Sequence, residues 1–298
     1  MANLRDIRTR ISSIKNTQQI TKDMKMVAAA KLRKAQQKMQ QTRPYAKKMG
    51  SVVSRLVGNS DVDNVLLRQP DEVDRVCLIV VGSDRGLCGG FNNNLFRKVE
   101  ETIHEEYQTY HENGKLDIIA IGRKANAYFP KRKYNVVSGF PGFFDDLNYG
   151  DTSGIMQEIT EQFVSGFYDK VVIAFNEFKT VISQNRLVET VLPISVSELD
   201  NDESSSQSGE IADYIYEPDV TTILDKILPV HVNMQLWRAV LDSNASEQGA
   251  RMAAMDNATE NAKELEEELQ LKYNQARQSA ITTEISEIVS GAAALEDN

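Results

Sequence analysis

The stretch "GSDRGLCGGFN" at residues 82–92 follows the apolar run "VCLIVV" and precedes a helical pattern. A glycine-rich turn between a strand and a helix is a common place for proteins to hold phosphate. A dinucleotide site would need G-x-G-x-x-G followed by an acid about 20 residues later, and a P-loop would need G-x-x-x-x-G-K-[ST]. The glycines at 82, 86, 89 and 90 fit neither spacing. The pattern therefore predicts a tight structural turn, with "NNN" supplying side chains that cap the next helix.

Other groups that could do chemistry are few and scattered. Arg85 could contact a phosphate, but a single arginine is equally consistent with a structural contact or a contact with a protein partner. The three histidines, His104, His111 and His231, are not clustered with carboxylates at metal-ligand spacing, and two cysteines cannot fill a tetrahedral site. No Ser-His-Asp arrangement is visible, and the acids at 264–268 are most simply a solvated helix face. We expect no catalytic residue, no metal and no cofactor.

The middle of the chain contains the elements that position the glycine-rich turn. Residues 73–81, 116–122 and 169–175 read as buried strands, separated by helical patterns around 95–111, 123–129 and 152–167. Strand–helix–strand alternation at this spacing predicts a small Rossmann-like α/β domain with a parallel sheet. Residues 177–194 are expected to add one or two edge strands. Residues 200–210 are acidic and rich in serine, which is typical of an exposed, disordered loop.

Both ends of the chain predict long helices. No glycine precedes Gly50 and no proline precedes Pro44, and apolar residues recur at helical spacing. After Pro229 a similar stripe of small and apolar residues continues, from a helix start expected near 219–222. Two such stripes predict an antiparallel coiled coil of the two ends, although polar residues at 16–21 weaken its seam. A bundle of local hairpins is disfavoured because neither segment contains turn signals.

Charge is distributed unevenly. The whole chain carries −9, but residues 1–48 hold thirteen basic side chains against two acids, a net +11, which leaves −20 elsewhere. The basic end therefore favours an acidic neighbour. Nucleic acid is a weaker alternative, because aromatic residues are not interleaved with the basic ones. The longest apolar run, 76–81, is too short for a membrane span, and no secretory signal is visible.

Five segments in this order resemble the gamma-subunit family of F-type ATP synthases. They are "IRTRISSIKNTQQITKDMKMVAAAKLRKAQ" (7–36), "GSDRGLCGGFN" (82–92), "YIYEPD" (214–219), "SEQGARMAAMDNATENA" (246–262) and "YNQARQSAITTEISEIVSGAAAL" (273–295). The resemblance implies a rotor shaft, not catalytic by itself, that couples ion flow across a membrane to ATP synthesis or hydrolysis. It also implies three parts: a coiled-coil helix at 1–58, the α/β domain at 70–215 and a second coiled-coil helix at 216–298.

The same resemblance implies partners and contact residues. The partners would be the alpha and beta subunits, the epsilon subunit and the c ring, at the cytoplasmic face of the cell membrane without insertion into it. The apolar tip "IVSGAAAL" would turn in an apolar sleeve. No inserted cysteine pair of the chloroplast kind is present, so redox switching is not expected. Contacts with the surrounding ring are implied for Met24, Lys25, Lys31, Arg33, Lys34, Arg251, Gln278, Thr282 and Glu284, and foot contacts with the c ring and epsilon for Tyr214, Tyr216 and Glu217.

Overall fold

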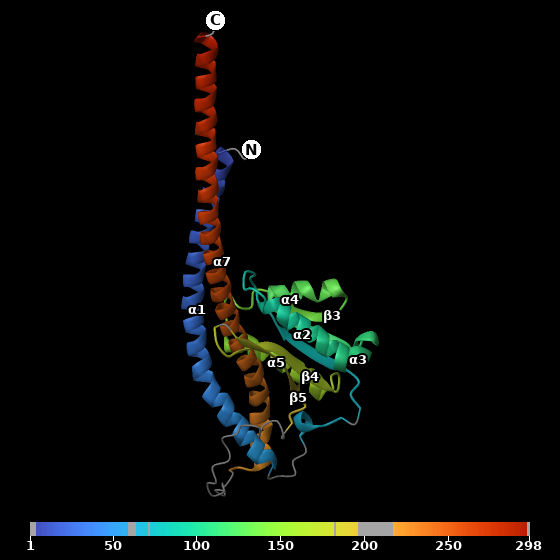
Figure 1. Ribbon diagram of the computed structural model, residues 1–298. Coiled ribbons are helices and arrows are strands. Elements are labelled where there is room, and N and C mark those ends of the chain that lie inside the picture. The colour runs from blue at the N-terminus through green and yellow to red at the C-terminus, as the bar shows by residue number, and fades with distance from the viewer. Residues whose placement is uncertain (1–3, 59–63, 71, 182, 196–216, 297–298) are drawn as a thin grey trace. The chain divides into compact units, whose positions relative to one another are not determined.

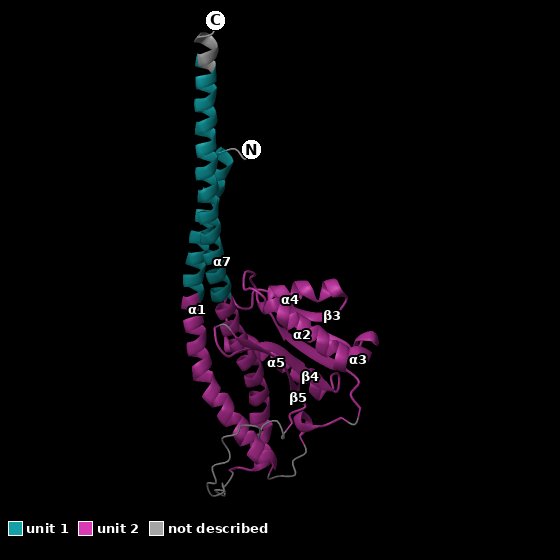
Figure 2. Ribbon diagram, viewed as in Figure 1, with its two compact units in different colours: residues 1–28, 251–298 teal, residues 29–250 magenta. Residues whose placement is uncertain are grey.

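The computed structural model describes residues 4–58, 64–70, 72–181, 183–195 and 217–296. The chain forms two compact units, which share its two long helices (Figures 1 and 2). Unit 1 contains residues 1–28 and 251–298, and unit 2 contains residues 29–250. The long helices are α1 (Leu4–Gly58) and α7 (Val220–Glu296). The Asp219 carboxylate accepts a hydrogen bond from the backbone N–H of Thr222 at 3.0 Å, so α7 begins with an N-cap where the sequence predicts one.

Unit 1 is an antiparallel pair of helices. Polar contacts within unit 1 join α1 to α7, and the residue numbers rise along one helix as they fall along the other. These contacts are Arg8–Tyr273 at 3.3 Å, Lys15–Glu266 at 3.2 Å, Thr21–Thr259 at 2.8 Å and Lys25–Asp256 at 2.5 Å. The predicted antiparallel pairing is therefore confirmed. Buried apolar side chains, among them Ile11, Ala28, Met255 and Leu269, lie in the same unit, so polar pairs and apolar contacts both hold the helices together.

Unit 2 contains a five-stranded sheet in the order β3-β2-β1-β4-β5. Its strands β1, β2, β3 and β4 are parallel, and β5 pairs antiparallel with β4 at the edge. The sheet is thus mixed rather than wholly parallel, because 177–194 turns back on itself. The strands are β1 (Val76–Val81), β2 (Leu116–Ile121), β3 (Asn135–Phe140), β4 (Lys170–Phe178) and β5 (Gln184–Leu192).

Helices cover both faces of this sheet. The shorter elements of unit 2 are α2 (Phe91–Glu106), α3 (Gln108–Glu112), α4 (Arg123–Tyr128) and α5 (Tyr149–Val164), with 3-10 turns η1 (Val65–Leu67) and η2 (Pro130–Arg132). Side chains of β1 alternate between two cores, since successive residues of a strand point to opposite faces. Val76, Leu78 and Val80 pack with α2 and α4, whereas Cys77, Ile79 and Val81 pack with α5 and α7.

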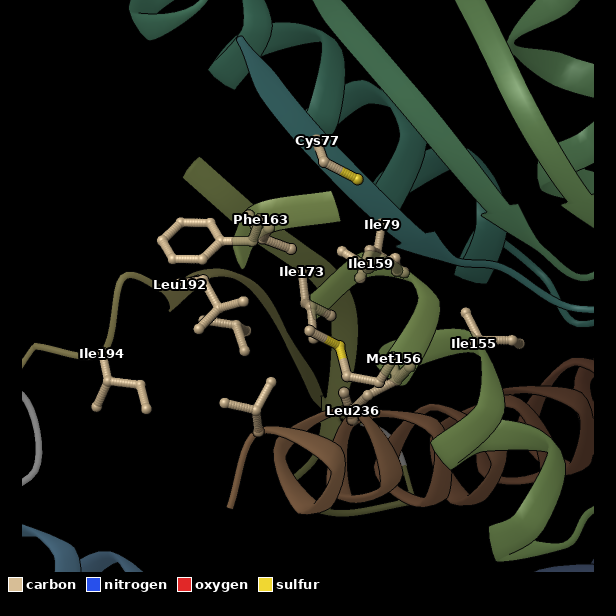
Figure 3. Close-up of a cluster of buried hydrophobic side chains, with 14 of the residues drawn as sticks. Cys77, Ile79, Ile155, Met156, Ile159, Phe163, Ile173, Leu192, Ile194 and Leu236 are labelled. Carbon is tan, nitrogen blue, oxygen red and sulfur yellow. The ribbon is translucent and has the colours of Figure 1, made fainter. Parts of the chain in front are cut away.

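The core on the α7 side ties the long helices of unit 2 to the sheet. Phe163 and Met156 of α5 are fully buried beside Ile173 of β4, and Leu236 of α7 packs into the same cluster (Figure 3). Val53 of α1 is also fully buried there. Each such side chain contributes roughly 1.5–3 kcal/mol of burial free energy, so this core holds the unit 2 parts of α1 and α7 on the sheet.

Candidate functional site: a filled glycine-rich turn and a paired-helix contact surface

The glycine-rich turn after β1 is held by its own side chains. The Asn92 side chain accepts a hydrogen bond from the Ser83 backbone N–H at 3.0 Å and donates one to Ser83 Oγ at 2.7 Å. The N-cap of α2 is Gly90, with no side-chain cap hydrogen bond. The prediction that an asparagine of "NNN" caps α2 is therefore wrong. Asn92 lies inside the first turn of the helix and bonds back to the preceding loop instead.

A buried carboxylate accepts hydrogen bonds from backbone N–H groups at the carboxyl end of the parallel strands. Asp84 is 8% exposed and accepts hydrogen bonds from the backbone N–H groups of Arg123 at 2.9 Å, Gly142 at 2.7 Å and Phe144 at 2.8 Å. Converging backbone amides are the groups that hold phosphate in nucleotide sites. Here the chain's own carboxylate takes them, which supports the structural interpretation of the turn.

Close backbone packing explains one glycine beside this cluster. Gly122 has φ +92°, and a Cβ on it would lie 3.0 Å from the carbonyl carbon of Ser83. Only glycine fits both that conformation and that approach. On the surface above, Arg85 and Arg123 each lie 3.3 Å from an Asp145 oxygen. Arg85 is thus part of a surface ion-pair group.

Neither the cysteines nor the histidines form part of a metal-binding group among the residues that the structure describes. Cys77 and Cys88 are free and buried, and burial raises the pKa of the Cys77 thiol far above its ordinary value, with nearby Asp117 adding to the effect. Burial and then Arg238 lower the pKa of His231 to about 4. Over the described ranges no three His, Cys, Asp or Glu side chains form a group that could hold a metal ion.

The basic part of α1 presents most of its charge outward. Lys31, Arg33 and Lys34 are exposed, while the buried residues between and around them, Leu32 and Ala35, face the molecule's interior. Lys25 is half-buried and paired with Asp256, and Met24 is half-buried next to it. The family resemblance implies that these residues contact the ring. Lys31, Arg33 and Lys34 are exposed and could meet an acidic surface, whereas Lys25 already forms an ion pair within unit 1.

The carboxyl-terminal contact residues lie in two different environments. Arg251 is 8% exposed. Gln278, Thr282 and Glu284 are exposed, and the Thr282 hydroxyl donates a hydrogen bond to the Gln278 carbonyl at 2.9 Å. Because the described part of α1 begins at Leu4, one turn before Arg8, the helix beyond Arg277 has no described α1 residue opposite it. This part of α7 extends past the amino-terminal end of α1 in Figure 1.

The far end of α7 carries exposed apolar side chains. Ile285 is 56% exposed, Ile288 70% and Val289 62%. Their exposure follows from the single-helix geometry, since no second described helix covers them. Of the foot residues, Glu217 is exposed, while Tyr214 and Tyr216, like the acidic loop at 200–210, lie outside the described residues.

The residues that sequence reasoning missed are mainly buried polar ones. Asp84 was passed over because a lone aspartate in a turn carries no spacing signal. Asp242 pairs with Arg43 of α1 at 3.0 Å, and its side chain is 3% exposed. Burial raises the Asp242 pKa despite the arginine, because the carboxylate loses most of its solvent. The sequence signal for Asp242 is an isolated acidic residue inside an otherwise apolar helical pattern.

Antiparallel terminal helices, with an α/β domain inserted between them in the sequence, define the class: a coiled-coil stalk with an inserted doubly wound domain. The family model described as "ATP synthase" matches residues 3–295. The chain is 48% identical to the "ATP synthase gamma chain" of Chloroherpeton thalassium over 303 residues, covering all of both chains, and 48% identical to that of Prosthecochloris aestuarii over 297 residues, 99% of each. The chain therefore belongs to the ATP synthase gamma-chain family.

A solved structure shares the fold. The chain is similar to a chain of the Euglena gracilis mitochondrial ATP synthase, rotor, in rotational state 1, with a TM-score of 0.66 and 20% identity. The similarity covers 93% of this chain and 98% of that one. At this identity the comparison supports the fold alone. None of the helices in the described ranges is long and apolar enough to cross a membrane.

Proposed function

We propose that this chain is the rotating central stalk of an F-type ATP synthase. Gamma chains are non-catalytic subunits of that complex, and the observation that carries the proposal is the full-length family match combined with the antiparallel pairing of the terminal helices. A shaft of this kind acts mechanically. Its asymmetric surface interacts differently with each surrounding catalytic subunit, and differential interaction is what shifts a conformational equilibrium.

The partners we propose are the ring of alpha and beta subunits, the epsilon subunit and the c ring. The α/β domain (70–215) would remain outside the ring, while the helical parts 1–58 and 216–298 would form the shaft. Ion flow through the membrane part would turn the stalk and drive ATP synthesis, and hydrolysis would turn it in reverse. The location would be the cytoplasmic face of the cell membrane, through partners and not by insertion.

The proposed contacts with the ring use charge on α1 and small or polar side chains on α7. Lys31, Arg33 and Lys34 supply exposed positive charge for an acidic loop of the catalytic subunits. Met24 and Lys25 would contact the ring beside them. On α7, Gln278, Thr282 and Glu284 lie on exposed, single-helix surface, and Arg251 lies at the opposite end of the unit 1 segment of α7. Tyr214, Tyr216 and Glu217 would meet the c ring and epsilon.

Reconstitution tests the proposal directly. Purified chain should have no ATPase activity, but it should assemble with alpha and beta subunits of a close relative and restore sustained multi-site ATP hydrolysis. Attachment of a probe to the α/β domain should reveal rotation during hydrolysis. Failure to assemble, with a correctly folded chain by circular dichroism, would count against the stalk assignment.

A further inference from the structure

Unit 2 carries a groove lined by aromatic side chains on its helical surface. Two adjoining hollows of about 470 and 340 Å³ share four lining residues, so they form one depression between α1 and α7 with the start of α5 at its edge. We call it the aromatic groove and define it by Gln41, Thr42, Tyr45, Tyr149, Met234 and Trp237. All six residues belong to unit 2.

The aromatic rings of the groove are partly open to solvent. Tyr45 is 53% exposed and Tyr149 38%, while Val230 at the rim is 37% exposed. The Tyr149 and Trp237 rings meet edge to face, with centroids 5.9 Å apart at 86°. Trp237 is the single tryptophan of the chain. Exposed tyrosine and tryptophan in a concave, partly apolar surface are the side chains that contribute most to protein–protein binding.

The charge around the groove is positive. Beyond the proposed ring-contact residues, the part of α1 at residues 35–58 contains five Lys and Arg and no Asp or Glu. Lys38 lines the groove, and Lys48 lies on the same face of the helix, three residues after Tyr45.

The α5 end of the groove carries acidic residues. Asp146 is exposed there. The carboxylate of Asp151 accepts a hydrogen bond from the Asn148 side chain at 2.8 Å. The rim formed by α1 is therefore complementary to a negatively charged partner.

The shape of the groove favours a helical partner. Two helices of unit 2 form its walls, and a third helix laid along such a groove can insert side chains spaced three and four apart. We propose that the aromatic groove is a docking site for an acidic amphipathic helix of a partner protein. An apolar side chain of that helix would insert between Tyr45 and Trp237, and its carboxylates would face Lys38 and Lys48. This surface is separate from the ring contacts proposed for residues 24–34 and does not rest on the stalk function.

Trp237 makes the proposal measurable, because it is the only source of tryptophan fluorescence. The full-length chain would be titrated with a synthetic helical peptide of about 18 residues, with Glu on one face and Leu and Phe on the other. We expect a saturable change in Trp237 emission. A peptide with Lys in place of Glu should bind at least about tenfold more weakly, because it removes the charge complementarity.

Variants of the chain separate the groove from general electrostatics. Tyr45→Ala should abolish the saturable change, and Lys38→Glu with Lys48→Glu should reverse the preference between the two peptides. The matched control Lys131→Glu, on an exposed residue of η2, should leave binding unchanged. Circular dichroism would verify that each variant is folded.

Several outcomes would overturn the proposal. These are no response to the acidic peptide, an equal response to the Lys peptide, or an equal loss of binding in the Lys131→Glu control. A change in emission with protein concentration alone would indicate a second copy of this chain as the occupant. A response to vesicles of phosphatidylcholine and phosphatidylglycerol equal to that of the peptide would indicate a lipid surface. None of these results bears on assembly with alpha and beta subunits, which is measured separately.

Discussion

Lys25 of α1 and Asp256 of α7 meet across the paired helices of unit 1, with the lysine Nζ 2.5 Å from an aspartate oxygen. One turn away, Thr21 Oγ1 and Thr259 Oγ1 lie 2.8 Å apart. An apolar seam with many small side chains does not specify one register strongly. Paired polar groups do, because a shift of one turn would separate each donor from its acceptor.

Exchanging the two charges tests this register. Lys25→Asp alone places two carboxylates together and should lower stability by about 1 kcal/mol, since both side chains are partly solvated. The double variant Lys25→Asp with Asp256→Lys should recover most of that loss. Urea unfolding followed by ellipticity at 222 nm measures both. Lys22→Asp, on an exposed residue of the same helix, is the control. A double variant no more stable than the single one would show that the ion pair does not form.

Asp84 should contribute strongly to the stability of the loops at the carboxyl end of the sheet. Its carboxylate accepts three backbone N–H groups while 8% exposed, so Asp84→Ala leaves three donors with only water as a replacement. We expect a loss of about 2–4 kcal/mol in unfolding free energy. Asp146→Ala, on an exposed residue of the loop that contains Gly142 and Phe144, should cost little. Equal stability of the two variants would mean that the three hydrogen bonds contribute nothing net.

The hydrogen bonds to Asp84 also predict that the chain does not bind nucleotides. Because Asp84 already holds amides that could have bound phosphate, isothermal calorimetry with ATP, ADP or NAD should show no saturable heat on the full-length chain. Saturable binding that is lost on changing Arg85 or Arg123 would revive a nucleotide function for the α/β domain.

His231 should make stability depend on pH in a defined window. Burial, and next Arg238, lower its pKa from 6.5 to about 4, and a side-chain nitrogen of Gln235 lies 3.2 Å from its Nε2. A ring whose Nε2 carries no proton can accept this hydrogen bond from the Gln235 amide, whereas a protonated ring cannot. The unfolded chain therefore binds the proton more readily than the folded chain between these two pKa values. Stability from this group is complete above pH 6.5 and is lost as the pH falls toward 4, by on the order of 3 kcal/mol.

A variant isolates that contribution. His231→Leu should be less sensitive than the wild type to a fall from pH 7 to pH 4, when unfolding free energies are compared at each pH. His104→Leu, on an exposed residue of α2, should retain the wild-type slope. If His231→Leu and the wild type lose stability in parallel, the pKa of His231 is the same in the folded and unfolded chains, and burial does not lower it.

Strands and helices with a clear hydrophobic pattern could be predicted from the sequence. The element that could not be predicted, β3, has a physical reason for its weak pattern. The runs at 73–81 and 116–122 correspond to β1 and β2, because strands buried on both faces are continuously apolar. The strand β3 was missed. As an edge strand it alternates between exposed and half-buried residues over six positions, and its Gly139 weakens the pattern.

Side-chain relationships were harder to predict than elements. The pairing of α1 with α7 follows from matching stripes, but its register depends on four polar contacts between residues more than 200 positions apart. The aromatic groove combines Tyr45, Tyr149 and Trp237 from three helices, and no local spacing brings them together. Not every apolar residue at helical spacing is buried: Val27 is 57% and Leu265 41% exposed.

The exposed charge on α1 should govern the interaction with the surrounding ring. Reversing it with Lys31→Glu, Arg33→Glu and Lys34→Glu should leave the chain folded, because all three side chains are exposed, yet reduce multi-site ATP hydrolysis of the reconstituted complex several-fold. The defect should be larger at low salt, where exposed charges act over about 10 Å or more. A control with the same change in net charge, Lys131→Glu, Lys133→Glu and Lys179→Glu, alters exposed residues elsewhere in unit 2. Equal hydrolysis by the two triple variants at every salt concentration would show that the positive charge on α1 does not contribute to coupling.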